Sequence, residues 1–208
     1  TETLYDKNIK GSLLGVLDKT KTAMGARLIK KMLREPLNDA EKINDRLDAV
    51  EEIYLDPLLE NDLVESLKKI YDFERLAARI ATGTANGKDL IALRNSIAVL
   101  PNIKADLSSS GSNLLKDIHD GISNLEDIAD LITESISENA GFTIKEGGLI
   151  IDGYSENLDN LKASIKDAKT WIAGLEAHER ERTGIKTLKV GYNKVFGYYI
   201  DVTRANSD

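Results

Sequence analysis

The sequence predicts a mainly α-helical protein with a multihelical core, one long helix and a small terminal β-hairpin. Over residues 1–140, apolar residues recur at helical spacing between capping residues, glycines and prolines. Around residues 155–183 the pattern becomes a heptad repeat, and over 187–203 apolar and polar residues alternate as in strands. We therefore predict a helical core over 1–140, an extended segment followed by the long helix over 141–183, and a hairpin over 184–208.

The first helices of the core are defined by caps and prolines. Thr22 can cap a helix over residues 22–34, and Glu35-Pro36 ends it because a residue before proline disfavours the α region. Asn38, with Glu41 three residues later, resembles a capping box and predicts a helix to about residue 55. Asp56-Pro57 combines an N-cap with a proline at the first helical position, so the next helix should start there.

The rest of the core follows the same logic. Asp72 can open a helix that Gly83 closes, and Asn86 can open another that runs to about residue 100, where Pro101 would end it. The run Ser108–Gly111 is typical of a loop. Two shorter helices are predicted after this loop, over residues 113–119 and 125–137.

The pattern changes after residue 141. Leu149-Ile150-Ile151 lies between glycines and predicts a short strand or extended turn. The heptad repeat then predicts a helix of about 40 Å that Gly184 ends. Its apolar stripe is narrow and requires a partner helix, so we expect the chain to self-associate through this seam. The seam consists of Leu158, Leu161, Ile165, Ala168, Ile172 and Leu175.

A hairpin is predicted from the alternation of residues 187–203 around a five-residue loop, Asn193–Gly197. Four of the chain's aromatic residues lie within it, at Tyr192, Phe196, Tyr198 and Tyr199. Two strands alone are marginally stable in water, so we expect further strands to follow.

Composition limits the classes of function. The formal charge of −7 argues against a protein that coats nucleic acid or a membrane with its whole surface. No cysteine is present, no apolar run is long enough for a membrane helix, and the N-terminus is polar. We therefore expect no membrane association. The hairpin is locally basic, with four basic residues and one acid between Gly184 and Arg204.

Motifs for catalysis and cofactors are weak. The stretch Gly83–Asp89 has the wrong spacing for a phosphate-binding loop, carries Asp89 where a Ser or Thr is needed, and follows a helix. His119 and His178 are too far apart for a local metal motif. The charged run His178–Arg182 is typical of surface pairs on a helix. We predict no catalytic, metal or nucleotide site in this chain.

Two interpretations of the basic, aromatic hairpin remain open. In one, the aromatic residues pack a small β-module while the lysines keep its edge soluble. In the other, the lysines, backbone N–H groups and Asn193 contact a phosphate backbone.

Five blocks of sequence resemble the MutS family of DNA mismatch-repair proteins. They are GSLLGVLDKTKTAMGARLIKKMLREPL (11–37), INDRLDAVEEI (43–53), DFERLAARIATGTANGKDLIALRNS (72–96), EGGLIIDGY with a following LD (146–159), and ERERTGIKTLKVGYNKVFGYYIDVTRAN (179–206). The resemblance covers the family's core domain, its outgoing lever helix and the start of its clamp domain.

The resemblance implies a longer protein that is a homodimer, binds mismatched double-stranded DNA and uses ATP with magnesium in a domain absent here. It implies a cytoplasmic, nucleoid-associated location. The clamp would touch the DNA backbone without reading bases. From their place on the hairpin we expect the contacts to come from Lys186, Lys189, Asn193, Lys194 and Arg204. The alternative is a helical connector module with no DNA contact of its own.

Overall fold

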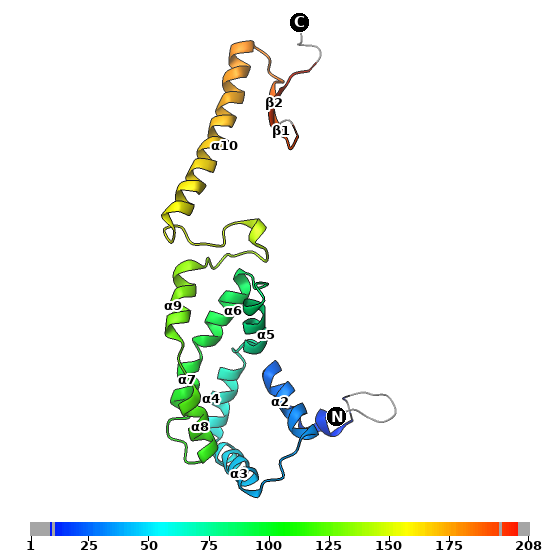
Figure 1. The fold of residues 1–208 in the computed structure, drawn as a ribbon, viewed down its shortest axis with the longest axis vertical. Coiled ribbons are helices and arrows are strands. Elements are labelled where there is room, and N and C mark those ends of the chain that lie inside the picture. The colour runs from blue at the N-terminus through cyan, green and yellow to red at the C-terminus, as the bar shows by residue number, and fades with distance from the viewer. Residues whose placement is uncertain (1–8, 10, 196, 204–208) are drawn as a thin grey trace. The chain divides into compact units, whose positions relative to one another are not determined.

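The computed structural model describes residues 9, 11–195 and 197–203. The chain divides into two compact units, one ending at Ile151 and the other beginning at Asp152. Each is described by itself. The first is helical, and the second consists of one long helix and a hairpin (Figure 1). This confirms the predicted fold class.

The first unit is a succession of short helices. α3 packs on α4 and α8, α4 on α7, α5 on α6, and α6 on α9. The elements are α1 (Leu13–Leu17), α2 (Ala23–Arg34), α3 (Ala40–Leu55), α4 (Pro57–Leu67), α5 (Phe73–Ala81), α6 (Gly87–Ile97), α7 (Leu100–Asp106), α8 (Asn113–Gly121), α9 (Glu126–Ser135) and the 3₁₀ turn η1 (Ile144–Glu146).

Most predicted helix starts are confirmed. Thr22, Asp56 and Asp72 each accept a backbone N–H from the first turn of α2, α4 and α5, respectively. At α6, Asn86 accepts from the Asp89 N–H while the Asp89 carboxylate accepts from the Asn86 N–H, a complete capping box. These starts were predictable because a cap depends only on residues within one turn.

The start predicted at Asn38 is wrong by one residue. Asp39 is the N-cap of α3, and its carboxylate accepts the N–H groups of Glu41 and Lys42. Asn and Asp are nearly equal as caps, so the sequence favours neither strongly. A carboxylate adds a favourable interaction with the positive end of the helix dipole.

Pro101 does not end a helix, contrary to the prediction. α6 ends at Ile97, and Pro101 lies in the first turn of α7. The first-turn N–H groups of a helix have no acceptor within it, so a proline there loses no hydrogen bond. A proline can therefore stand in the first turn of a helix or just after the end of one, and only the backbone conformation around it decides which.

The apolar core of this unit has two parts. One joins α3, α7 and α8 through Ala49, Val99, Ile103, Leu107 and Leu115. The other joins the end of α9 to the segment after it through Ile132, Ile136 and Ala140. The extended segment predicted at residues 149–151 is present: Ile150 forms an antiparallel bridge with Ile136, next to the second cluster.

The second unit begins with α10 (Glu156–Thr183), capped by Ser155 and ended by Gly184 in the left-handed conformation (φ 71°). The strands β1 (Lys189–Asn193) and β2 (Gly197–Asp201) then pair antiparallel. Pairing extends to Asn193 opposite Gly197, so the loop is three residues rather than the predicted five.

The predicted seam of α10 is exposed in its middle part, whereas Leu158, Ile172 and Leu175 are half-buried. No residue of α10 is buried, and Leu161 and Ile165 are 62% and 57% accessible to solvent. Trp171, beside the seam, is 67% accessible. The middle of the helix thus presents apolar side chains to solvent.

Candidate nucleic-acid interface

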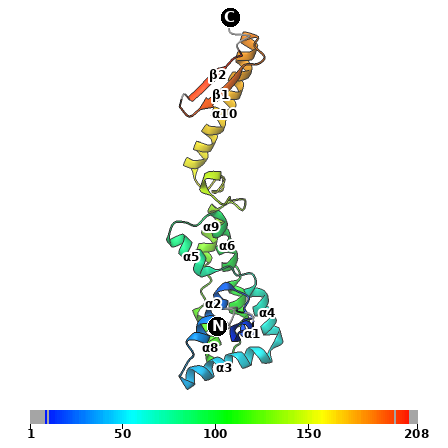
Figure 2. The ribbon, with the colours of Figure 1, turned by 90° about the vertical axis from the view of Figure 1, so that its right-hand side faces the viewer.

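The hairpin is attached to the end of α10 through β1, which lies on the helix side of the hairpin (Figure 2). The guanidinium Nε of Arg180 donates to the carbonyl oxygen of Leu188 at 2.7 Å. The Val190 N–H donates to Oε2 of Glu176 at 3.0 Å. Arg180 and Glu176 also form an ion pair at 2.6 Å, one helical turn apart. Together they fix the direction in which the hairpin leaves the helix.

Leu188 strengthens this attachment because its side chain is almost fully buried, at 2% accessibility. The charged run His178–Arg182 was predicted to form surface pairs, and Arg182 does pair with Glu179 at 2.7 Å. The role of Arg180 toward the strand was missed. Nothing in the local sequence shows that a carbonyl eight residues away comes within its reach.

The aromatic residues of the hairpin pair with each other across the strands. Tyr192 lies opposite Tyr198, and their ring centroids are 5.0 Å apart with planes tilted by 57°. The Tyr199 ring covers Gly191, where a Cβ atom would come within 2.7 Å of it. Tyr192 and Tyr198 both stay 62% accessible, so pairing covers only part of each ring.

The predicted lysines all lie on exposed parts of this hairpin. Lys186 is in the turn after α10, Lys189 begins β1, and Lys194 is in the loop. None of the three forms an ion pair within residues 11–195 and 197–203. Lys189 faces Asp201 across the ladder, which places one negative charge beside it.

Asn193 has a structural role as well. Its side-chain oxygen accepts the Val195 N–H at 2.8 Å and so shapes the loop. This leaves the amide NH₂ as the group able to donate to a phosphate. Arg204, the fifth predicted contact, lies outside the described residues.

The stretch Gly83–Asp89 connects α5 and α6. Its polar groups are paired with one another and with Arg79 of α5: Asp89 completes the α6 cap and forms an ion pair with Arg79 at 3.0 Å. The Thr84 and Ala85 N–H groups donate to the Arg79 carbonyl. Gly87 is packed so closely that a Cβ atom there would overlap Ala140. Close packing therefore explains why position 87 is a glycine, and the sequence pattern does not reveal this reason.

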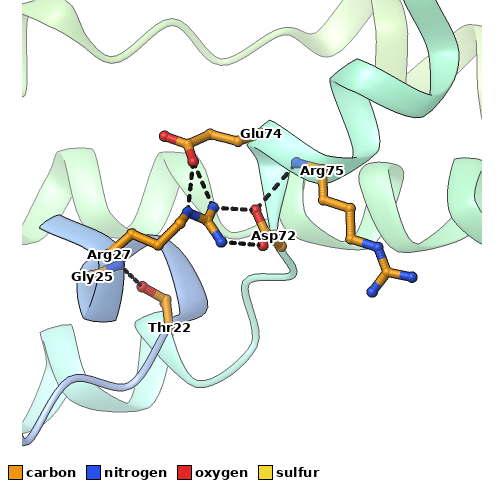
Figure 3. A network of polar contacts seen from close by, with 6 residues as sticks. All are labelled: Thr22, Gly25, Arg27, Asp72, Glu74 and Arg75. Atoms are coloured by element: carbon orange, nitrogen blue, oxygen red, sulfur yellow. Dashed lines mark hydrogen bonds and ion pairs between the residues drawn. The ribbon is translucent and has the colours of Figure 1, made fainter. Parts of the chain in front are cut away.

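A second polar network, also unpredicted, joins α2 to the start of α5 (Figure 3). Arg27 donates two hydrogen bonds to Asp72, at 2.8 and 2.7 Å, and two to Glu74, at 3.0 and 2.5 Å. The guanidinium lowers the pKa of Asp72 to about 2 and the two carboxylates raise the pKa of Arg27. The side chains are partly or largely exposed, so this network positions helices at the surface rather than forming a buried charge cluster.

Within the described ranges, no group of three or more His, Cys, Asp and Glu side chains is arranged to hold a metal ion. Of the helices described, none combines the length and apolar character that crossing a membrane requires.

The sequence of this helical chain with its terminal hairpin matches one protein family. A family model described as MutS domain III matches residues 1–196, and the chain belongs to the MutS family. It is 52% identical over 206 residues to the "DNA mismatch repair protein MutS" of Alkaliphilus oremlandii, an alignment that covers 99% of this chain and 23% of that relative.

Two further relatives with the same description give similar values. The protein of Desulforamulus reducens is 50% identical over 206 residues, with 99% of this chain and 24% of the relative covered. That of Halothermothrix orenii is 50% identical over 208 residues, with 100% and 23% covered. The chain thus spans under a quarter of the length of these relatives.

Proposed function

We propose that this chain is the core, lever and first clamp segment of a longer mismatch-repair protein, and that its hairpin contacts the DNA backbone. The observation that carries the proposal is the set of Lys186, Lys189 and Lys194. These cations are exposed, have no ion pair in the described ranges, and stand on a hairpin attached to the end of a long helix. Asn193 and Arg204 complete the proposed contact set.

For the longer protein, the proposal includes binding of mismatched double-stranded DNA, homodimer formation and ATP-dependent signalling with magnesium in a different domain. The relatives' description as DNA mismatch repair proteins supports the first of these. In the division we propose, residues 1–140 form the core, 141–183 the connection and lever, and 184–208 the start of the clamp. We propose a cytoplasmic, nucleoid-associated location for the longer protein.

The chemistry of the hairpin fits a contact that does not depend on base sequence. Lysine ammonium groups neutralise phosphates and release condensed counterions, which makes binding strongly dependent on salt. Discrimination between bases would require side chains held rigidly against base edges. The three lysines stand on a turn, an edge strand and a loop tip, so they suit phosphate contacts.

The test is a double charge reversal, Lys189→Glu with Lys194→Glu, in the full-length protein. Affinity for matched and mismatched duplexes should fall alike, and the slope of log K against log salt should flatten by about 1 for each lysine–phosphate interaction that is removed. The matched control is Lys166→Glu with Lys169→Glu, which makes the same charge change on α10. An unchanged slope in the hairpin variant would contradict the proposed DNA contact.

The second candidate function is a connector that relays motion and makes no DNA contact. It is favoured by the Glu176–Arg180 attachment, which would transmit the direction of α10 to the hairpin whether or not DNA is bound. In that case Glu176→Gln would alter signalling, while the lysine reversals would leave DNA affinity and its salt slope unchanged.

A further inference from the structure

A cavity lies between α5 and α6, beside the network of Arg27 and Asp72. It encloses about 390 Å³ and belongs entirely to the unit that ends at Ile151. Its apolar lining includes Leu76 of α5, Ala92 of α6 and Phe142 from the segment after α9. This volume lies within the range of roughly 300–1,000 Å³ that is usual for ligand pockets, so the cavity can hold a few side chains of a bound molecule.

Two aromatic residues of the cavity wall are held in place although both are exposed. The Tyr71 N–H donates to Oγ of Ser96, which is completely buried, at 2.9 Å. The Lys88 ammonium lies 3.7 Å from the centroid of the Phe142 ring, which is a cation–π contact. Tyr71 and Phe142 nevertheless remain 55% and 66% accessible to solvent. Exposed aromatic side chains beside an arginine are enriched among the residues that carry the binding energy of protein interfaces.

The cavity carries a surplus of positive charge. Its charged lining consists of three cations and two carboxylates, which are Arg75, Arg79, Lys88, Asp72 and Asp89. Both carboxylates are already paired, Asp72 with Arg27 and Asp89 with Arg79. The Arg75 side chain extends away from Arg27 (Figure 3) and, like Lys88, forms no ion pair with a residue that the structure describes. Two cations are therefore available to an acidic ligand, in a chain whose net charge is −7.

The lining favours a peptide over a nucleic acid. A DNA backbone presents a continuous row of phosphates, and those next to a bound phosphate would meet Asp72 and Asp89. The Thr84 and Ala85 N–H groups, which could otherwise bind a phosphate, already donate to the Arg79 carbonyl. An acidic peptide carries its charges on separate carboxylates with other side chains between them. Its carboxylates can reach the available cations while an apolar side chain lies against the aromatic wall.

We propose that this cavity is a docking site for a short acidic peptide segment of a partner protein. One carboxylate of the segment pairs with the guanidinium of Arg75, whose planar fork matches the two oxygens of a carboxylate. A second acidic group pairs with Lys88, and a neighbouring apolar side chain of the segment lies against Phe142 and Leu76. The site is on the helical core, so it goes beyond the DNA contact proposed for the hairpin and does not depend on it.

The experiment is selection from a phage-displayed library of random peptides on the full-length protein, after depletion of the library on the variant Arg75→Glu with Lys88→Glu. The enriched peptides should combine acidic with apolar residues. In fluorescence anisotropy, their synthetic forms should bind this variant at least about tenfold more weakly than wild type, because two attractive charge contacts become repulsive. A selection that enriches no acidic peptides would overturn the proposal. Displacement of the peptides by duplex DNA from the wild type and the hairpin lysine variant alike would also overturn it, because the ligand would then be a nucleic acid.

Two further variants separate docking from general charge attraction. Lys42→Glu with Lys69→Glu makes the same charge change at two exposed lysines outside this cavity and should keep the wild-type affinity. Equal weakening in this control would contradict a defined site. Phe142→Ser leaves Arg75 and Lys88 in place but removes the aromatic wall, and it should weaken binding at least about threefold because apolar contact is lost. Unchanged affinity in this variant would show that the peptides do not enter the cavity.

Discussion

Arg27 of α2 and Asp72, the N-cap of α5, form a bidentate ion pair between residues 45 positions apart in the sequence. Asp72 uses the same carboxylate to accept the Arg75 N–H at the start of α5. The Asp72 side chain therefore caps the start of α5 and also holds α2 through Arg27. No residue of α2 is fully buried, so this exposed contact contributes a relatively large part of its attachment.

The variant Asp72→Asn tests this attachment, because Asn also caps helices but carries no charge. Amide exchange in α2 should accelerate roughly two- to fivefold, the range expected from an exposed ion pair, while α5 stays protected. The pKa of Asp72 is lowered from 3.8 to about 2 in the folded protein, so its contribution is complete above pH 3.8 and is lost as the pH falls toward 2. Unchanged exchange in α2 at neutral pH would show that apolar packing alone holds this helix.

Glu52 of α3 caps a helix to which it does not belong. Its two carboxylate oxygens accept the Gly111 and Ser112 N–H groups, each at 2.8 Å, at the start of α8. The N-cap residue Ser112 makes no side-chain cap hydrogen bond itself. We expect Glu52→Gln to lower the free energy of unfolding by about 1 kcal/mol, because a charge-assisted bond becomes a neutral one and one acceptor oxygen is replaced by an amide NH₂.

Denaturant unfolding at several pH values measures this effect. Backbone hydrogen bonds from Gly111 and Ser112 lower the pKa of Glu52 below its usual 4.5. The difference between wild type and Glu52→Gln should be full above that value and shrink as the pH falls below it. A difference that does not change with pH would mean that the charge has no role.

Gly87→Ala tests the close packing at the start of α6. The added Cβ would overlap the Cβ of Ala140 and lie 2.6 Å from Cδ1 of Leu149. We expect a loss of about 1–3 kcal/mol in the free energy of unfolding, as for other overpacked sites. Gly174→Ala in α10 is the matched control, because a Cβ there meets no atom within 4 Å. The control should be neutral or stabilising by up to about 1 kcal/mol, and equal losses in both variants would contradict the packing argument.

The exposed middle of the α10 seam, at Leu161 and Ile165, predicts self-association of the chain in isolation. Sedimentation of residues 1–208 should show a concentration-dependent dimer that Leu161→Lys with Ile165→Lys reduces at least about tenfold, because charges in an apolar seam oppose pairing. Ala163→Lys is the control, since Ala163 is exposed on a different side of α10. A well-folded monomer at high concentration would contradict the prediction.

The sequence by itself determined the helical class, the caps at Thr22, Asp56, Asp72 and Asn86, and the end of the long helix at Gly184. These features depend on residues within one turn of each other, so local physical chemistry is sufficient to predict them. The heptad seam of α10 and the hairpin also follow from the local spacing of apolar residues alone.

The tertiary structure alone decided the rest. Arg27 with Asp72, Glu52 with the start of α8, and Gly87 with Ala140 join residues far apart in the chain, and no local pattern distinguishes these residues from ordinary surface charges or flexible glycines. The same holds for the hairpin. Alternation predicts which side chains share a face, but only the tertiary structure shows that Glu176 and Arg180 attach β1 to α10.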